Sequence, residues 1–128
     1  MKSHRLLIVE DEFILAMDLK ARLGEMGYGV VGKAGTGAAA IAAAEQHRPD
    51  LILMDIRLSG HMDGIAAASE IRRHHDIPVI FMSAYADEET RQRAAAAEPA
   101  GFLSKLTTDR DLRTAIETAL GGVSPNRS

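Results

Sequence analysis

Short apolar runs alternate with stretches of helical periodicity along this chain, and this alternation limits the possible folds more than any other feature. Runs of four or five apolar residues, each bounded by polar residues, occupy positions 6–9, 51–54 and 78–82. Runs of this length are typical of strands that are buried on both faces. Two weaker strand candidates lie at residues 29–32 and 101–103.

Helical patterns fill the intervals between these runs. The first predicted helix ends at Gly27, and its expected buried stripe consists of Leu15, Leu19, Leu23 and Met26. Three further helices are predicted over residues 37–47, 63–75 and 88–97. The last helix follows Thr108 and ends at Gly121. The side chains that we expect to cap helices are Thr36, Asp87 and Thr108.

Five strands that alternate with five helices predict an α/β protein with a parallel sheet covered by helices on both faces. Right-handed crossovers restrict the connections. The flavodoxin-like (βα)5 arrangement, with strand order 2-1-3-4-5, is the one we expect for such a sheet. The 128 residues suit one domain, which we place at residues 1–122, followed by a polar C-terminal tail at 123–128.

Composition excludes several classes of function. The chain has no cysteine, which rules out disulfides and thiolate metal sites. Its net charge of −3 argues against a nucleic-acid-binding domain, which normally carries a basic surplus. No apolar run reaches the roughly 18 residues of a membrane span or the length of a signal peptide. We therefore expect a cytoplasmic protein that binds neither nucleic acid nor membrane.

Acidic residues follow two strands that are neighbours in the predicted sheet. Glu10 and Asp11 end the first strand, and Asp55 ends the third. The strand order reverses there, which is where open parallel sheets place their sites. Clustered carboxylates repel one another, so a protein that gathers them usually binds a cation there. Oxygen ligands without histidine or cysteine favour a hard ion, and two or three carboxylates suit Mg²⁺ best.

A hydroxyl and an ammonium group are predicted at the same edge of the sheet. Ser83 ends the fourth strand, and Lys105 follows the fifth. Taken singly, each is an ordinary loop residue. Beside a metal site, however, a lysine can neutralise one phosphoryl oxygen and a serine can donate a hydrogen bond to another. The joint placement therefore indicates phosphoryl chemistry.

These features resemble the receiver domain of two-component response regulators, in its stand-alone form. The resemblance runs from Leu6 to about Leu120. Its five motifs are Ile8-Val9-Glu10-Asp11-Glu12, Leu53-Met54-Asp55-Ile56-Arg57-Leu58, Met62-Asp63-Gly64, Phe81-Met82-Ser83-Ala84 and Gly101-Phe102-Leu103-Ser104-Lys105. Each motif alone is weak, but five in the right order on the right strand ends are specific.

The resemblance implies a phosphoacceptor domain of a phosphorelay and not a turnover enzyme. Asp55 would attack the phosphorus of a phosphohistidine on a sensor histidine kinase or a phosphotransfer protein, giving an aspartyl phosphate. Asp11 and Asp55 would ligate Mg²⁺ directly, and Glu10 would act through water. The backbone carbonyl of Arg57 would be the third protein ligand.

The resemblance also implies a conformational switch. Ser83 would move toward the phosphoryl group, and Phe102 would rotate inward behind it, although Phe102 also suits a plain core position. The surface formed by the helix at 88–97, the strand at 101–103 and the last helix would change. That surface would engage an unidentified downstream protein or a second copy of the chain in a homodimer.

Two features depart from the family pattern or border its site. Leu106 replaces the proline that usually follows the lysine, so we expect a trans Lys105–Leu106 bond, a displaced Lys105 loop and a remodelled partner surface. Arg57 and Tyr85 lie two residues beyond the expected phosphoacceptor and the serine. We expect both to shield the phosphoryl group from water.

Three alternatives compete with this interpretation. A phosphatase of the haloacid dehalogenase type would carry an acid two residues after its nucleophile, where this chain has Arg57. A flavodoxin-like cofactor binder would have a hydroxyl- and glycine-rich loop after the first strand, where this chain has the acids at 10–12. A receiver-like module that signals without phosphorylation draws its support from Leu106.

Overall fold

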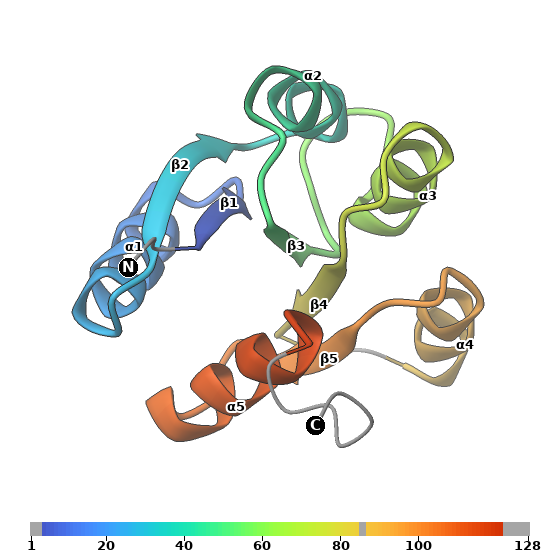
Figure 1. The fold of residues 1–128 in the computed structure, drawn as a ribbon. Coiled ribbons are helices and arrows are strands. Elements are labelled where there is room, and N and C mark those ends of the chain that lie inside the picture. Colours follow the sequence, from blue (N-terminus) through green and yellow to red (C-terminus); the bar gives the residue numbers. More distant parts are fainter. Residues whose placement is uncertain (1–3, 85–86, 122–128) are drawn as a thin grey trace.

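The computed structural model describes residues 4–84 and 87–121, in which strands and helices alternate as predicted (Figure 1). The strands are β1 (Arg5–Val9), β2 (Gly29–Ala34), β3 (Leu51–Asp55), β4 (Val79–Ser83) and β5 (Gly101–Ser104). The helices are α1 (Phe13–Glu25), α2 (Gly37–His47), α3 (Gly64–His74), α4 (Glu88–Ala96) and α5 (Asp109–Ala119). The predicted tail at 123–128 lies outside the described residues.

The strands form one parallel sheet in the order β2-β1-β3-β4-β5, which confirms the predicted flavodoxin-like topology. Helices α1 and α5 cover one face of the sheet, and α2, α3 and α4 cover the other (Figure 1). Val9 pairs with Met54, and Asp55 pairs with Met82. The residues that follow β1 and β3 therefore emerge side by side at the carboxyl edge.

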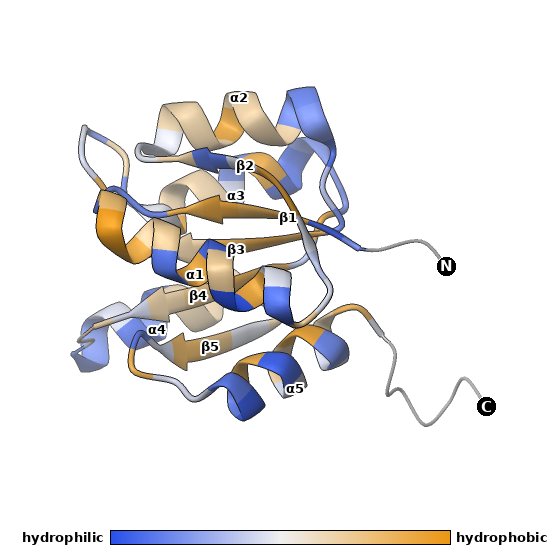
Figure 2. Cartoon of the chain, turned by 90° about the vertical axis from the view of Figure 1, so that its left-hand side faces the viewer, coloured by the Kyte–Doolittle hydropathy of each residue, from blue (hydrophilic) through white to orange (hydrophobic). Residues whose placement is uncertain are grey.

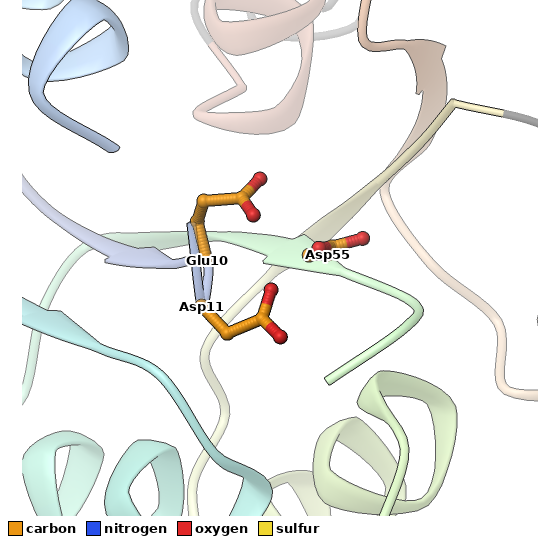
Figure 3. Close-up of side chains that lie close together, drawn as sticks. All are labelled: Glu10, Asp11 and Asp55. Atoms are coloured by element: carbon orange, nitrogen blue, oxygen red, sulfur yellow. The ribbon is translucent and has the colours of Figure 1, made fainter. Parts of the chain in front are cut away.

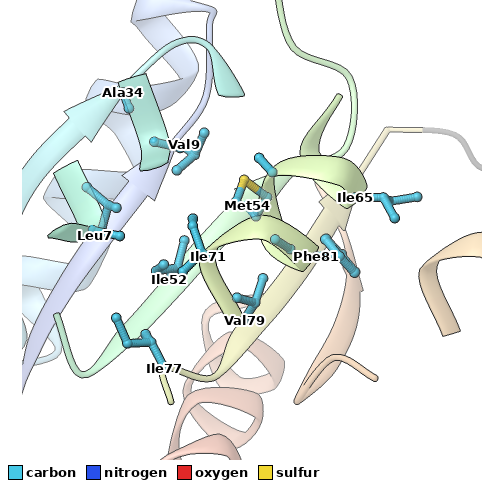
Figure 4. Close-up of a cluster of buried hydrophobic side chains, with 14 of the residues drawn as sticks. Leu7, Val9, Ala34, Ile52, Met54, Ile65, Ile71, Ile77, Val79 and Phe81 are labelled. Atoms are coloured by element: carbon cyan, nitrogen blue, oxygen red, sulfur yellow. The ribbon is translucent and has the colours of Figure 1, made fainter. Parts of the chain in front are cut away.

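Two apolar layers hold the helices to the sheet. Figure 4 shows the layer beneath α2, α3 and α4, in which Phe81 is fully buried. Strands β3 and β4 are buried along their whole length, as expected for central strands between helical layers. Figure 2 shows the hydrophobic residues concentrated on the strands. Each fully buried Leu, Ile or Phe contributes about 1.5–3 kcal/mol, so these layers provide the rigid base for the strand ends.

Side chains at the helix N-termini accept hydrogen bonds from the first turn. The three predicted caps are confirmed: Thr36, Asp87 and Thr108 accept from backbone amides at 3.0, 2.8 and 3.1 Å. Asp63 caps α3 in the same way, at 2.9 Å. Such caps satisfy amides that have no partner within the helix. Among the helices of residues 4–84 and 87–121, none is long and apolar enough to cross a membrane.

Helix α1 buries most of the predicted stripe and differs from it at its start. Leu19 and Leu23 are buried as predicted and Met26 packs against the same core, whereas Leu15 is 41% exposed and Ala16 is buried in its place. Neighbouring helical positions point about 100° apart, so a helix that buries Ala16 and Leu19 must turn Leu15 away from the centre of the contact. Small Ala16 lets the start of α1 lie close to the sheet.

Candidate functional site

Three carboxylates meet at the carboxyl edge of β1 and β3. Figure 3 shows Glu10 and Asp11 at the end of β1 and Asp55 at the end of β3. One ligand oxygen from each lies within 4.8 Å of the others. The pairing of Val9 with Met54 accounts for this, because it brings the next residues of both strands to the same level. The structure thus brings together the three acids that the sequence places at strand ends.

Both oxygens of Asp55 are held by hydrogen bonds although the residue is only 5% exposed. Oδ1 accepts from the backbone amide of Arg57 at 3.2 Å, and Oδ2 accepts from Lys105 Nζ at 2.9 Å. A buried carboxylate that is paired in this way has a fixed orientation. Its oxygens are accordingly presented to the cleft in a defined direction.

Lys105 forms an ion pair with two acids at once. Its Nζ lies 2.7 Å from Glu10 Oε1 and 2.9 Å from Asp55 Oδ2, and its side chain is 17% exposed. Residues 104–107 contain no cis bond, so the Lys105–Leu106 bond is trans as predicted. Lys105 nevertheless lies at the site, and the displaced loop and remodelled partner surface stay predictions. The backbone amide of Lys105 donates to Ser83 O at 3.0 Å and continues the β4–β5 ladder, which keeps the lysine at the site.

Burial and charge shift the pKa values of the paired groups. Burial raises the pKa of Asp55, the hydrogen bond from Lys105 lowers it and the negative charge of Glu10 raises it, and together these effects bring the pKa to about 6. Burial opposes the charged form of Lys105, but its hydrogen bonds to Glu10 and Asp55 outweigh that and raise its pKa. At neutral pH an ionised carboxylate therefore lies directly against an ammonium group.

Asp11 is held by Ser59, a loop residue to which the sequence interpretation gave no role. Its Oδ2 accepts a hydrogen bond from Ser59 Oγ at 3.0 Å, and Ser59 bridges to Thr36 as an isolated parallel pair. Glu10 is oriented locally, since its Oε2 accepts from the backbone amide of Glu12 at 3.1 Å. A serine in the loop after β3 has no distinctive sequence pattern, so its contact with Asp11 is seen only in the structure.

The acidic group suits a hard divalent cation. All three side chains offer carboxylate oxygens, and in the described part of the chain they form a set within 4.8 Å to which no nitrogen or sulfur ligand belongs. Oxygen-only sets of this kind match Mg²⁺ or Ca²⁺. Asp11 is exposed, which leaves the cluster open to solvent. The residues present therefore fit the predicted metal.

A cleft of about 400 Å³ opens beside the acids. Its lining consists of Asp11, Glu12, Asp55, Arg57, Ser83, Ala84 and Lys105. Ser83 is buried at the end of β4, next to the strand that carries Asp55. The cleft thus gathers the predicted carboxylate, hydroxyl and ammonium groups around a volume large enough for a phosphoryl group.

Two predicted residues lie apart from this cleft or outside the described residues. Phe102 pairs with Phe81 across β4 and β5, is half-buried and lies under the guanidinium of Arg91, 5.2 Å from the ring centre. It lines a separate hollow beside α4. The side chain of Arg57 is exposed at the mouth of the cleft. Tyr85 lies outside the described residues.

Gly64 allows the chain to turn sharply behind Asp55. A Cβ at this position would lie 2.0 Å from the backbone oxygen of Asp55, far inside contact distance. The amide of Gly64 donates to the carbonyl oxygen of Ile56 at 2.7 Å. The third motif of the sequence, which includes this glycine, therefore has a steric reason: α3 begins against the backbone of Asp55.

Known proteins are similar to this chain in sequence and in fold. The sequence matches the response regulator receiver domain family over residues 6–117. Transcriptional regulatory protein PdtaR of Mycobacterium tuberculosis is 41% identical over 116 residues, covering 91% of this chain and 56% of PdtaR. The signal receiver domain of a modulated diguanylate cyclase from Desulfovibrio desulfuricans G20 is 36% identical with a TM-score of 0.89, over 94% of this chain and 96% of that one.

One further solved structure bears on the acidic cluster. The receiver domain of sensor histidine kinase PA1611 from Pseudomonas aeruginosa PAO1 holds a magnesium ion coordinated in its active site cleft. It is 30% identical to this chain with a TM-score of 0.84, over 94% of this chain and 99% of that one.

The chain belongs to the response regulator receiver domain family. Receiver domains are signalling domains and not metabolic enzymes, and they interact with histidine kinases or phosphotransfer proteins. The chain spans about half the length of the curated PdtaR relative.

Proposed function

We propose that this protein is a phosphoacceptor in a two-component system or phosphorelay. A carboxylate oxygen of Asp55 attacks the phosphorus of a phosphohistidine on a histidine kinase or phosphotransfer protein. A P–O bond forms, the P–N bond breaks, and the leaving imidazole takes up a proton. The observation that carries the proposal is the buried Asp55 carboxylate, fixed by the Arg57 amide and by Lys105 at the edge of an acidic cluster.

Glu10, Asp11 and Asp55 are the residues that we propose hold Mg²⁺, with the backbone carbonyl of Arg57 as a further ligand. The oxygen-only donor set supports this assignment, as does the magnesium ion coordinated in the active site cleft of the PA1611 receiver domain. When bound, Mg²⁺ offsets negative charge on the transferred phosphoryl group.

Lys105 and Ser83 complete the proposed site from the neighbouring strands. Lys105 Nζ already touches Asp55 Oδ2, so it is placed to neutralise a phosphoryl oxygen on that carboxylate. Ser83 lines the same cleft and is the hydroxyl that we propose donates to another oxygen. Positioning and charge neutralisation are the main contributions a protein makes to phosphoryl transfer.

We further propose that phosphorylation alters the surface formed by α4, β5 and α5. Phe102 lies half-buried on β5 under Arg91, and an inward rotation of its ring would release that contact and reshape the hollow beside α4. The altered surface would then bind a downstream protein or a second copy of the chain. The same proposal includes a receiver unit at residues 1–122 and a cytoplasmic location. It also includes a role for Arg57 and Tyr85 in shielding the phosphoryl group from water.

The donor protein is proposed to contact an apolar rim beside the acids, formed by Phe13, Ile14 and Leu106. Phe13 and Ile14 begin α1 just after Asp11, and Leu106 follows Lys105. Ile14 is 78% exposed and Leu106 is 89% exposed. Exposed apolar side chains grouped around a polar cleft are typical of protein-binding surfaces. A carrier protein that brings its phosphohistidine to Asp55 would approach this same edge of the sheet.

Intact-mass spectrometry after incubation with acetyl phosphate and Mg²⁺ tests the proposal. We expect a gain of one phosphoryl group in the wild type and none in Asp55→Asn. The same measurement is then repeated with a phosphorylated histidine kinase or phosphotransfer protein as donor. If neither donor phosphorylates the wild type, the proposal is wrong, and a module that signals without phosphorylation takes its place.

A further inference from the structure

Arg22 joins α1 to the loop that carries Lys105. Its Nε donates to Asp109 Oδ1 at 2.6 Å, and its Nη2 donates to the carbonyl oxygen of Thr107 at 2.9 Å. The Arg22 side chain is 22% exposed. A guanidinium that holds a carboxylate and a carbonyl at once is fixed in direction, because its donors lie in one rigid plane. Arg22 therefore fastens the β5–α5 connection, at Thr107, and the start of α5, at Asp109, to α1.

The fastened segment is a tight turn at residues 104–107. The amide of Leu106 donates to Ser104 Oγ at 3.0 Å, and the amide of Thr107 donates to Ser104 O at 3.1 Å. Lys105 lies within this turn, and its own amide is bonded to Ser83 O. The sheet thus fixes the first end of the turn, and Arg22 fixes the other end at Thr107.

Arg22 also shares a cavity with the reacting groups. A space of about 40 Å³ between α1 and the sheet is lined by Glu10, Asp55, Lys105 and Arg22, together with apolar side chains. Water-sized spaces of this kind leave side chains room to shift. If Arg22 releases the turn, the loop can move toward solvent, and Lys105 is withdrawn from Asp55 across this cavity.

We propose that Arg22 is a positioning residue for phosphoryl transfer, which by clamping Thr107 and Asp109 holds the 104–107 turn so that Lys105 Nζ stays against Asp55. The proposal rests on the proposed function of Asp55. A proline after the lysine would restrict the turn covalently. Leucine supplies no such restriction at position 106, and the Arg22 clamp accounts for the position of Lys105 despite it.

Two measurements on the full chain test the clamp. The first is the rate of phosphorylation by acetyl phosphate at fixed Mg²⁺. The second uses NMR without a phosphodonor and records backbone order parameters for residues 104–108 and the side-chain ammonium signal of Lys105. The variants are Arg22→Ala, Arg22→Lys and Asp109→Ala. The matched control is Lys20→Ala, which removes an exposed cation from the same helix.

Arg22→Ala is expected to slow phosphorylation on the order of tenfold, because small displacements of an aligned group are costly. Order parameters across residues 104–108 fall in the same variant. Arg22→Lys keeps a cation beside Asp109 and restores much of the phosphorylation rate and of the order parameters. Lys20→Ala matches the wild type. The double variant Arg22→Ala/Asp109→Ala is expected to be no slower than Arg22→Ala, since both changes break one interaction.

A folded Arg22→Ala variant with the wild-type rate and an ordered turn would overturn the proposal. Should Arg22→Ala fail to fold, Asp109→Ala gives the decision through the same two measurements, because it removes the carboxylate that Arg22 holds. A wild type that acetyl phosphate and a protein donor both leave unmodified contradicts the proposed function instead. In that case the NMR comparison still reports whether Arg22 orders the turn and the Lys105 ammonium.

Discussion

Asp55→Asn is expected to stabilise the metal-free protein at neutral pH. Burial, reinforced by the charge of Glu10, raises the pKa of Asp55 from 3.8 to about 6 in the folded state, although Lys105 opposes this. Between these two values the folded state binds more protons than the unfolded chain, so stability falls as the pH rises. This loss of stability is absent at pH values below 3.8 and complete at pH values above about 6. It amounts to about 3 kcal/mol.

Urea unfolding curves recorded with a chelator at about pH 7.5 and about pH 4.5 give the comparison. At the higher pH the Asn variant is expected to exceed the wild type by up to about 3 kcal/mol, and the gain shrinks at the lower pH. Asp76→Asn is the matched control, because Asp76 is an exposed aspartate between α3 and β4. If the unfolding free energies of the wild type and Asp55→Asn differ by the same amount at both pH values, the reasoning is refuted.

Three more predictions concern the metal, the turn behind the site and the donor protein. Mg²⁺ is expected to raise the melting temperature of the wild type, and to do so much less in Asp55→Asn; an equal rise in both, measured by calorimetry, would remove Asp55 from the metal site. Gly64→Ala is expected to cost about 3 kcal/mol or more of unfolding free energy, because its Cβ would overlap the Asp55 backbone oxygen. In the same urea series, Gly24→Ala serves as the control, since a Cβ on α1 there meets nothing within 4 Å. Ile14→Ser and Leu106→Ser are expected to slow phosphoryl transfer from a protein donor about tenfold while acetyl phosphate still phosphorylates them at the wild-type rate; equal slowing with both donors would argue against the apolar rim.

The sheet is predictable from the sequence because its central strands are buried on both faces. A continuous apolar run such as 51–54, in a chain with regular turn signals, has few interpretations other than a buried strand. Parallel strands then place Glu10 and Asp55 at one edge of the sheet, whatever the side-chain details. The helix caps are equally local, since a threonine or aspartate bonds an amide three residues away. These features depend on short segments and on one topological rule.

The remaining features depend on contacts between distant segments. Arg22 lies 87 positions before Asp109, and Ser59 lies 48 positions after Asp11. Neither pair has a local signature. Leu106 does not move Lys105 away from the site, because the bonds that hold Lys105 come from Ser83 on β4 and from the distant acids Glu10 and Asp55. Leu15 shows the limit of periodicity, since two overlapping stripes on α1 fit the pattern and the close packing of Ala16 decides between them.

The ion pairs of Lys105 set the electrostatic balance of the site before any partner arrives. Three carboxylates face one ammonium there, which leaves two negative charges in excess. One divalent cation would make the group neutral. An aspartyl phosphate then adds roughly one further negative charge, in a place too buried for water to screen fully. Phosphorylation therefore gives the neutral site a net negative charge. Nearby hydrogen-bond donors that can move are then attracted toward the phosphoryl group. Asp55 is therefore both the acceptor and the point where a chemical change becomes an electrostatic force on the surrounding strands.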